Sequence, residues 1–137
     1  MGDGDLRRAM EQKAKTLGIA SRVIFTGIRS DVPDLMQAMD CFVFPSLYEG
    51  VPVTLIEAQA SGLPCIISEG VPAECVKTNL VKRLPVSIGV NVWAETILEK
   101  KGLSRPNPRR EIIEAGYDIE ANAQWLLNFY LEKWKDA

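Results

Sequence analysis

The sequence predicts an α/β fold in which helices cover both faces of a parallel sheet. Short, continuous apolar stretches alternate with segments whose apolar residues recur at helical spacing. Strands buried on both faces of a sheet have this continuous apolar character, whereas strands with one wet face alternate apolar and polar residues. Ligands bind such sheets at the carboxyl ends of the strands. We therefore expect the function to lie in the loops at 26–31, 45–52 and 68–74.

The composition indicates a single globular domain over residues 1–137. Of these residues 47% are hydrophobic and 25% are charged, and the formal net charge is -2. A chain of this length can bury a core, and its charge argues against a nucleic-acid partner bound through a basic field. The odd number of cysteines, three, suggests a reducing cytosol. With no histidine and no Cys-x-x-Cys motif, neither a zinc site nor a histidine base is expected.

Capping and chain-breaking residues bound the predicted elements in the first third of the chain. Gly18 is a natural C-cap for the first helix, and Ser30 or Asp31 can cap the second. Pro45 ends the strand that follows this second helix. The predicted elements are a helix over 5–17, a strand over 23–25, a helix from 30 or 31 to 39, and a strand over 41–44.

The remaining elements follow the same logic. Gly62 can close the helix that begins at 53, and Pro64 prevents its continuation. Lys82 and Arg83 are interpreted as a solvated surface pair. The predicted elements are a helix over 53–61, strands over 65–67 and 80–84, and helices over 89–101, 108–115 and 119–134. The last helix has one apolar stripe, formed by Ile119, Ala123, Leu126, Leu127, Tyr130, Leu131 and Trp134.

The segment 45–64 is the most informative in the chain. It places Glu49 and Glu57 with seven residues between them, and Gly50 and Pro52 form a turn in that interval. The loop ends at the N-terminus of a helix, where unpaired N–H groups attract anions, phosphate above all. Gly50 leaves room for a ligand, and Pro52 fits a helix start. Carboxylates suit the hydroxyls of a sugar or a ribose, because charge-assisted hydrogen bonds are strong.

Two glutamates at this spacing are common in proteins and are usually two solvated charges. The context favours a binding site here. A strand precedes the pair, a Gly/Pro turn separates its members, and a helix of small residues followed by another strand comes after it.

Residues 45–64 resemble the signature of retaining GT-B glycosyltransferases of family 4. The similarity is specific because several further segments resemble this family in the same order. These segments are 2–7 (Gly2 to Arg7), 25–27 (Phe25 to Gly27) and 39–46 (Met39 to Ser46). Residues 115–119, followed by Phe129 and Tyr130, are similar to capsule and exopolysaccharide members.

The resemblance implies roles for the matched residues. Glu49 resembles the catalytic glutamate that holds the donor sugar near the reacting carbon, and Glu57 resembles the glutamate that binds the ribose hydroxyls. Ile28 and Arg29 lie where the nucleobase packs in this family. The backbone that cradles the sugar and the diphosphate is matched by Gly50, Val51, Pro52 and Val53.

The resemblance also implies a Rossmann-like but incomplete C-terminal GT-B domain, without its first strands and without the acceptor domain. The absent strands would separate 23–25 from 41–44 in the sheet, and unpaired strand edges are costly when buried. We therefore expect these two strands to pair directly, or a second chain to fill the gap in a homo-oligomer. We expect the isolated chain to be inactive, because catalysis by positioning needs both walls of a cleft.

The function that follows is transfer of a sugar, with retention, from a nucleotide-sugar donor that we expect to be UDP-linked. The acceptor would be a growing glycan or a lipid-linked glycan in polysaccharide biosynthesis. No cofactor is expected, since the nucleotide-sugar is a substrate, and no metal dependence is expected. The expected location is cytoplasmic, with peripheral association at the inner face of the cell membrane left open. The alternative is a non-catalytic nucleotide-binding or interaction module with the same fold; the intact glutamate pair favours the transferase.

Overall fold

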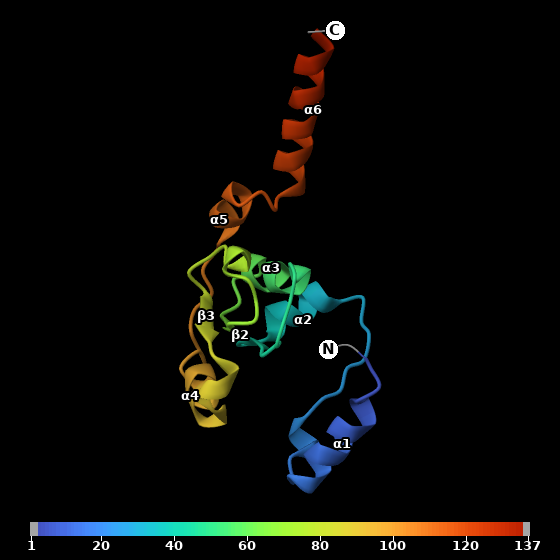
Figure 1. The fold of residues 1–137 in the computed structure, drawn as a ribbon, viewed down its shortest axis with the longest axis vertical. Helices are drawn as coiled ribbons and strands as arrows, with labels where there is room; N and C mark the ends of the chain where they lie inside the picture. Colours follow the sequence, from blue (N-terminus) through green and yellow to red (C-terminus); the bar gives the residue numbers. More distant parts are fainter. Residues whose placement is uncertain (1–2, 136–137) are drawn as a thin grey trace. The chain divides into compact units, whose positions relative to one another are not determined.

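The computed structural model describes residues 3–135, so Gly2 of the 2–7 segment lies outside the described residues. The chain divides between Val32 and Pro33 into two compact units. The first contains helix α1 (Arg7–Thr16) and a 3₁₀ turn, η1 (Ala20–Arg22). The second contains the sheet and the remaining helices (Figure 1). The prediction of a single domain over the whole chain stays a prediction.

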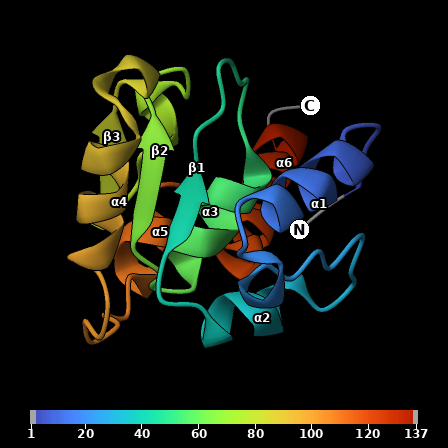
Figure 2. The ribbon, with the colours of Figure 1, turned by 90° about the horizontal axis from the view of Figure 1, so that it is seen from below.

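The second unit is built on a parallel sheet, as the sequence predicts. Its strands follow the order β1 (Phe42–Phe44), β2 (Cys65–Ser68) and β3 (Val81–Leu84). Figure 2 shows the three strands side by side and pointing the same way. Every residue of the central strand β2 is buried, which explains its uninterrupted apolar sequence. The predicted strand over 80–84 is confirmed as β3.

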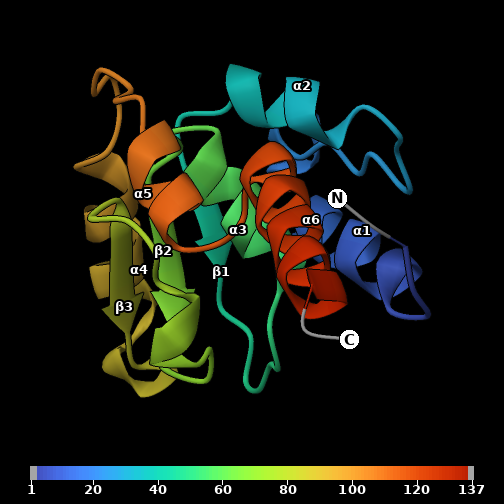
Figure 3. The same ribbon diagram turned by 90° about the horizontal axis from the view of Figure 1, so that it is seen from above.

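Helices cover both faces of this sheet. Helices α3 (Val53–Ala60) and α4 (Val90–Leu98) both contact β2. Figures 2 and 3, seen from opposite sides, show them on opposite faces. The other elements of the unit are α2 (Val32–Ala38), η2 (Ala73–Cys75), η3 (Val86–Ile88), α5 (Arg109–Glu114) and α6 (Ile119–Lys135). Helix α2 begins at the last residue of the first unit.

The core between α4 and the sheet is centred on Trp93. Its ring packs with Ile66 and Leu84, and Cys41 and Ile97 lie against this cluster. The indole N–H donates to the carbonyl of Pro85 at 3.2 Å, so the polar end of the side chain is paired despite its burial. This contact ties α4 to the end of β3.

Gly62 closes α3 as predicted. Its φ of +68° is a conformation that side chains rarely adopt, and a Cβ atom there would lie 2.4 Å from the carbonyl oxygen of Pro106. The N–H of Gly62 donates to Gln59 and the N–H of Leu63 donates to Ala58, which pairs the last carbonyls of the helix. Only glycine meets both requirements, so this residue ends α3.

The strand predicted at 23–25 is wrong. No strand forms there in the described structure, and Ile24 is 86% exposed. A strand exists only through hydrogen bonds to a neighbour, and among the described residues β1 pairs with β2 alone. The segment is held instead by Arg7, which donates to the carbonyl of Phe25 at 3.2 Å. The expected pairing of 23–25 with 41–44 would join the two units, and it stays a prediction.

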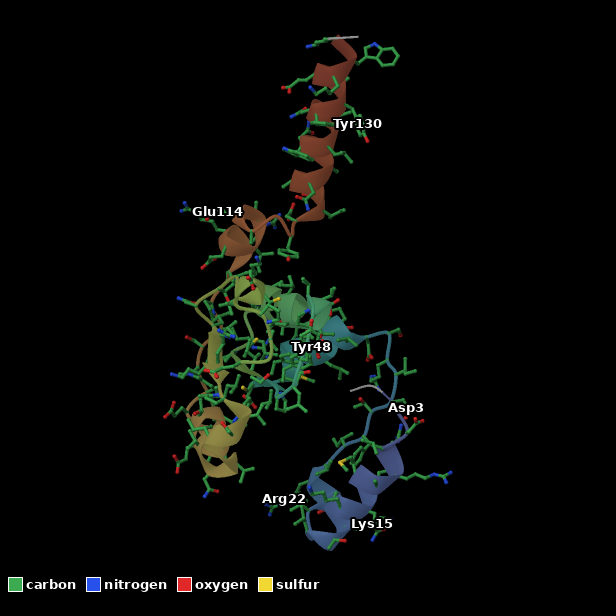
Figure 4. The ribbon with its side chains drawn as sticks, in the orientation of Figure 1. Asp3, Lys15, Arg22, Tyr48, Glu114 and Tyr130 are labelled. Atoms are coloured by element: carbon green, nitrogen blue, oxygen red, sulfur yellow. The ribbon has the colours of Figure 1, made fainter. Side chains whose placement is uncertain are left out.

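The predicted C-terminal helix is confirmed as α6, but its apolar stripe is exposed. Trp134 is 83% exposed, and Tyr130 projects from the helix in Figure 4. The described part of α6 contains no buried residue.

Candidate functional site

The candidate site lies where the loops after β1 and β2 meet. Loop 45–52 leaves the carboxyl end of β1 and leads into α3, and residues 69–72 leave the carboxyl end of β2. The N–H of Glu49 donates to the carbonyl of Gly70 at 3.2 Å. The predicted meeting of these two loops at one edge of the sheet is therefore confirmed. Loop 26–31 belongs to the first unit.

The two loops touch through their backbones. The hydroxyl of Ser68 donates to the carbonyl of Ser46. A Cβ atom on Gly70 would lie 2.2 Å from the carbonyl oxygen of Leu47 and 2.9 Å from that of Ser46. Backbone atoms cannot move aside as a flexible side chain can, so this approach requires glycine at position 70.

The carboxylate of Glu49 is oriented by a neighbour in its own loop. The Ser46 hydroxyl lies 2.7 Å from Oε1 of Glu49 and 3.2 Å from the carbonyl of Tyr48. A hydroxyl has one proton to donate, and the ionised carboxylate is the stronger acceptor. Glu49 is half-buried, whereas Tyr48, labelled in Figure 4, is 86% exposed. In the part of the chain that the structure describes, Ser46 is the side chain bonded to this carboxylate.

Glu57 lies on the outer side of α3. It is exposed, whereas Leu55, Ile56, Ala58 and Gln59 of the same helix are buried. Because Glu57 is the fifth residue of α3, its carboxylate is about one turn beyond the helix N-terminus. Both glutamates thus belong to the loop–helix segment predicted from the sequence.

The N-terminus of α3 has no side-chain cap. Pro52 occupies the N-cap position, is buried and makes no side-chain hydrogen bond there. Its neighbours Val51 and Val53 are 63% and 66% exposed. The start of a helix carries backbone N–H groups without intrahelical partners, which favours a bound anion. The four predicted cradle residues therefore lie where a phosphate group can be bound.

Gln59 is a supporting residue that sequence reasoning missed. Its amide is fully buried and donates to the carbonyl of Cys75 at 2.9 Å, while its oxygen accepts from the N–H groups of Lys77 and Thr78 at 2.7 and 3.1 Å. It thereby fastens 75–78 to α3. The available signal was a polar residue four positions after Leu55, on the buried face of the helix.

Arg83 is also a supporting residue. The prediction that Lys82 and Arg83 form a solvated surface pair is wrong for Arg83. Its Nη2 atom donates to the carbonyls of Glu69 and Val71 at 3.1 and 3.0 Å, and the residue is half-buried. Lys82 is exposed, as predicted. Side chains alternate between the faces of a strand, so adjacent basic residues in β3 have different environments.

Ile28 and Arg29 belong to the first unit, whereas Glu49 and Glu57 belong to the second. Ile28 is 86% exposed, and Arg29 forms an ion pair with Asp31. Hydrogen bonds from Arg29 lower the pKa of the Asp31 carboxyl. Their contact with a nucleobase stays a prediction.

No cluster of three or more potential metal ligands occurs within residues 3–135. Asp3 and Asp5 do have the Asp-x-Asp spacing of some metal-binding carboxylates. The Asp3 carboxylate accepts from the N–H of Gly4 at 2.9 Å and lies 3.8 Å from the Arg7 guanidinium.

Comparison with known proteins decides the family. The family model described as "Glycosyl transferases group 1" matches residues 1–99. The chain belongs to this family. The matched residues include the loop–helix segment with Glu49 and Glu57, and also both supporting residues, Gln59 and Arg83.

The curated relatives of this group 1 chain are longer proteins. EpsF of Bacillus subtilis (strain 168), a glycosyltransferase by its name, is 44% identical over 94% of the chain and 35% of its own length. The UDP-Gal:alpha-D-GlcNAc-diphosphoundecaprenol alpha-1,3-galactosyltransferase of Escherichia coli is 29% identical over 96% of the chain and 36% of its own length. The Vi polysaccharide biosynthesis protein VipC/TviE of Salmonella typhi is 46% identical over 55% of the chain and 13% of its length. The chain thus spans about a third of the first two relatives.

None of the helices described over residues 3–135 combines the length and the apolar character needed to cross a membrane.

Proposed function

We propose that this chain forms the donor-binding edge of a retaining glycosyltransferase that builds a polysaccharide. The enzyme would transfer a sugar from a UDP-linked donor to a growing glycan or a lipid-linked glycan. One observation carries this proposal: the Glu49 carboxylate, held by Ser46, precedes the uncapped N-terminus of α3 in the same loop. A carboxylate for a sugar hydroxyl and free N–H groups for a diphosphate are thereby provided by one segment.

Each residue has a defined task in this proposal. Glu49 is the catalytic glutamate that orients the donor sugar, and Glu57 accepts hydrogen bonds from the ribose. The backbone of 50–53 surrounds the diphosphate, with N–H groups from every residue but Pro52. Negative charge develops on the diphosphate as it leaves, and donors aimed at that charge stabilise the transition state. Ile28 and Arg29 would contact the base.

One relative supports the choice of UDP, and two support a lipid-linked acceptor. The name of the Escherichia coli relative gives UDP-galactose as its donor and a diphosphoundecaprenol-linked sugar as its acceptor. The name of a Campylobacter jejuni relative, 45% identical over 34% of the chain, also gives a diphospho-undecaprenol acceptor. Such acceptors lie at a membrane, so we propose cytoplasmic action with peripheral association at the inner face.

We also propose that neither a metal nor a cofactor takes part, and that this chain alone does not turn over. The acceptor would bind to a second domain, because positioning both substrates needs both sides of a cleft. A non-catalytic nucleotide-binding module is the alternative. Such a module would bind nucleotide without needing Glu49 for the sugar.

Calorimetric titration of the chain in EDTA-containing buffer tests the proposal. We expect saturable UDP binding that Glu57→Ala weakens about tenfold, as loss of a charged hydrogen bond predicts. Glu49→Gln should weaken UDP-galactose and leave UDP unchanged, because Glu49 contacts only the sugar.

Glu120→Ala is the matched control, since it removes an exposed carboxylate on α6. Equal UDP affinity in the Glu57→Ala variant would contradict the assigned site. Glu49→Gln without effect on UDP-galactose would favour the nucleotide-binding module.

A further inference from the structure

We propose that Arg83, on β3, is a positioning residue for Glu49. It would act by holding the turn at 69–71, against which the backbone of Glu49 is hydrogen-bonded. This inference rests on the proposed function of Glu49 as the glutamate that orients the donor sugar. Arg83 itself would touch neither sugar nor nucleotide.

The turn after β2 presents three consecutive carbonyls, and each has a partner. Arg83 binds the carbonyls of Glu69 and Val71, at 3.1 and 3.0 Å. The carbonyl between them, that of Gly70, accepts from the N–H of Glu49 at 3.2 Å. Arg83 thus binds the carbonyls on either side of the Gly70 carbonyl, which accepts the hydrogen bond from Glu49.

Residues 69–71 are also restrained on two sides, by β3 and by the loop that carries Glu49. The N–H of Glu69 donates to Leu84 at 3.1 Å, which continues the pairing of β2 with β3. On the other side, the missing Cβ of Gly70 allows contact with the carbonyl of Leu47. A shift of 69–71 must therefore move the backbone that carries Glu49, because packed backbone atoms transmit displacement.

The environment of Arg83 fits a task in the loop better than a task in the core. No acidic side chain pairs with it among the described ion pairs. Its Nε atom is buried and has no hydrogen-bond partner within the described residues. An incompletely paired buried group lowers stability, and apolar side chains often stabilise such positions more. What the guanidinium gains is the pair of carbonyls that its Nη2 atom bridges.

Amide hydrogen exchange of the intact chain tests the inference without any ligand. Arg83→Met keeps the apolar length and removes both carbonyl contacts. We expect exchange of the Glu49 amide to accelerate about tenfold or more, since contacts made by a charged donor are lost. Amides of β2 should keep their rates. Lys82→Met removes a neighbouring exposed charge from the same strand. It should change neither the exchange rate of the Glu49 amide nor those of the β2 amides.

Two results of this experiment would overturn the inference. One is an unchanged exchange rate at Glu49 in the Arg83→Met variant. The other is equal acceleration at Glu49 and throughout β2, which would mean that Arg83 only stabilises the unit. In Arg83→Lys the exchange rate of the Glu49 amide should lie between those of the wild type and Arg83→Met, because the ammonium keeps the charge but sits on a flexible stem that fixes its donors less well.

A ligand readout separates this inference from the function on which it rests. Arg83→Met should weaken UDP-galactose about tenfold while leaving UDP unchanged, since Glu49 contacts the sugar. Equal weakening of both ligands would contradict a role through Glu49. If no variant and no wild-type chain binds UDP, the proposed donor site fails, while the exchange rates still decide whether Arg83 holds Glu49.

Discussion

At the scale of single residues, the candidate site depends on one absent side chain. Gly70 has no Cβ, so the carbonyls of Ser46 and Leu47 can lie directly against the turn after β2. This contact lets Glu49 reach the Gly70 carbonyl with its N–H and the Ser46 hydroxyl with its carboxylate. The position of the catalytic candidate therefore follows from backbone packing, which does not depend on the ligand.

Gly70→Ala tests this contact. A methyl group placed 2.2 Å from a backbone oxygen must displace one of the two loops. We expect the free energy of unfolding to fall by about 1–3 kcal/mol, as for other overpacked sites. Urea denaturation measures it, with Gly4→Ala as the control, because a Cβ on Gly4 meets nothing within 4 Å. Wild-type stability in Gly70→Ala would show that the loops can separate without cost.

At the scale of elements, α3 both carries and braces the site. Its outer face carries Glu57, and its inner face carries Gln59, whose amide binds the segment after η2. Cys75, at the end of η2, also places its thiol 3.7 Å from the carbonyl of Gly50. Helix α3 thus connects the predicted ligand loop, 45–52, to the segment 75–78.

Gln59→Leu should destabilise the second unit. The substitution keeps the apolar bulk but leaves the N–H groups of Lys77 and Thr78 and the Cys75 carbonyl without their partner. We expect a loss of about 3 kcal/mol, because buried groups would stay unpaired. Thermal or urea unfolding measures the change. Gln37→Leu on α2, where the side chain is exposed, should be nearly neutral. A neutral Gln59→Leu would mean that water replaces these bonds.

At the scale of the whole molecule, burial of the central strand makes stability sensitive to alkaline pH. Desolvation raises the pKa of the Cys65 thiol from 9.0 to about 12, with a smaller contribution from Cys41. The unfolded chain therefore ionises this thiol at a lower pH than the folded chain. The contribution of the protonated Cys65 thiol to the free energy of unfolding is complete below pH 9 and is lost as pH rises toward 12.

Cys65→Ala should remove part of this alkaline dependence. The variant will be less stable at neutral pH because of the lost volume. Between about pH 9 and 10.5, however, its free energy of unfolding should fall less steeply than that of the wild type. The difference should approach about 1.4 kcal/mol per pH unit, the value for one proton. Parallel curves for the two proteins over that range would contradict the pKa shift.

The sequence by itself determined the features that depend on neighbours along the chain. The apolar runs predicted β1, β2 and β3, and Gly62 and Pro64 correctly bounded α3. The segment containing Glu49 and Glu57 was recognised because strand, turn and helix signals are local. The same local logic failed at 23–25, an apolar run that forms no strand in the described structure.

Only the tertiary structure decided which residues support the site. Arg83 meets the turn at 69–71 from twelve to fourteen positions away, and Gln59 meets 75–78 from at least sixteen. Gly70 meets Leu47 from another loop altogether. No periodicity in the sequence encodes such pairings, because they arise from the register of parallel strands and the packing of loops at one edge.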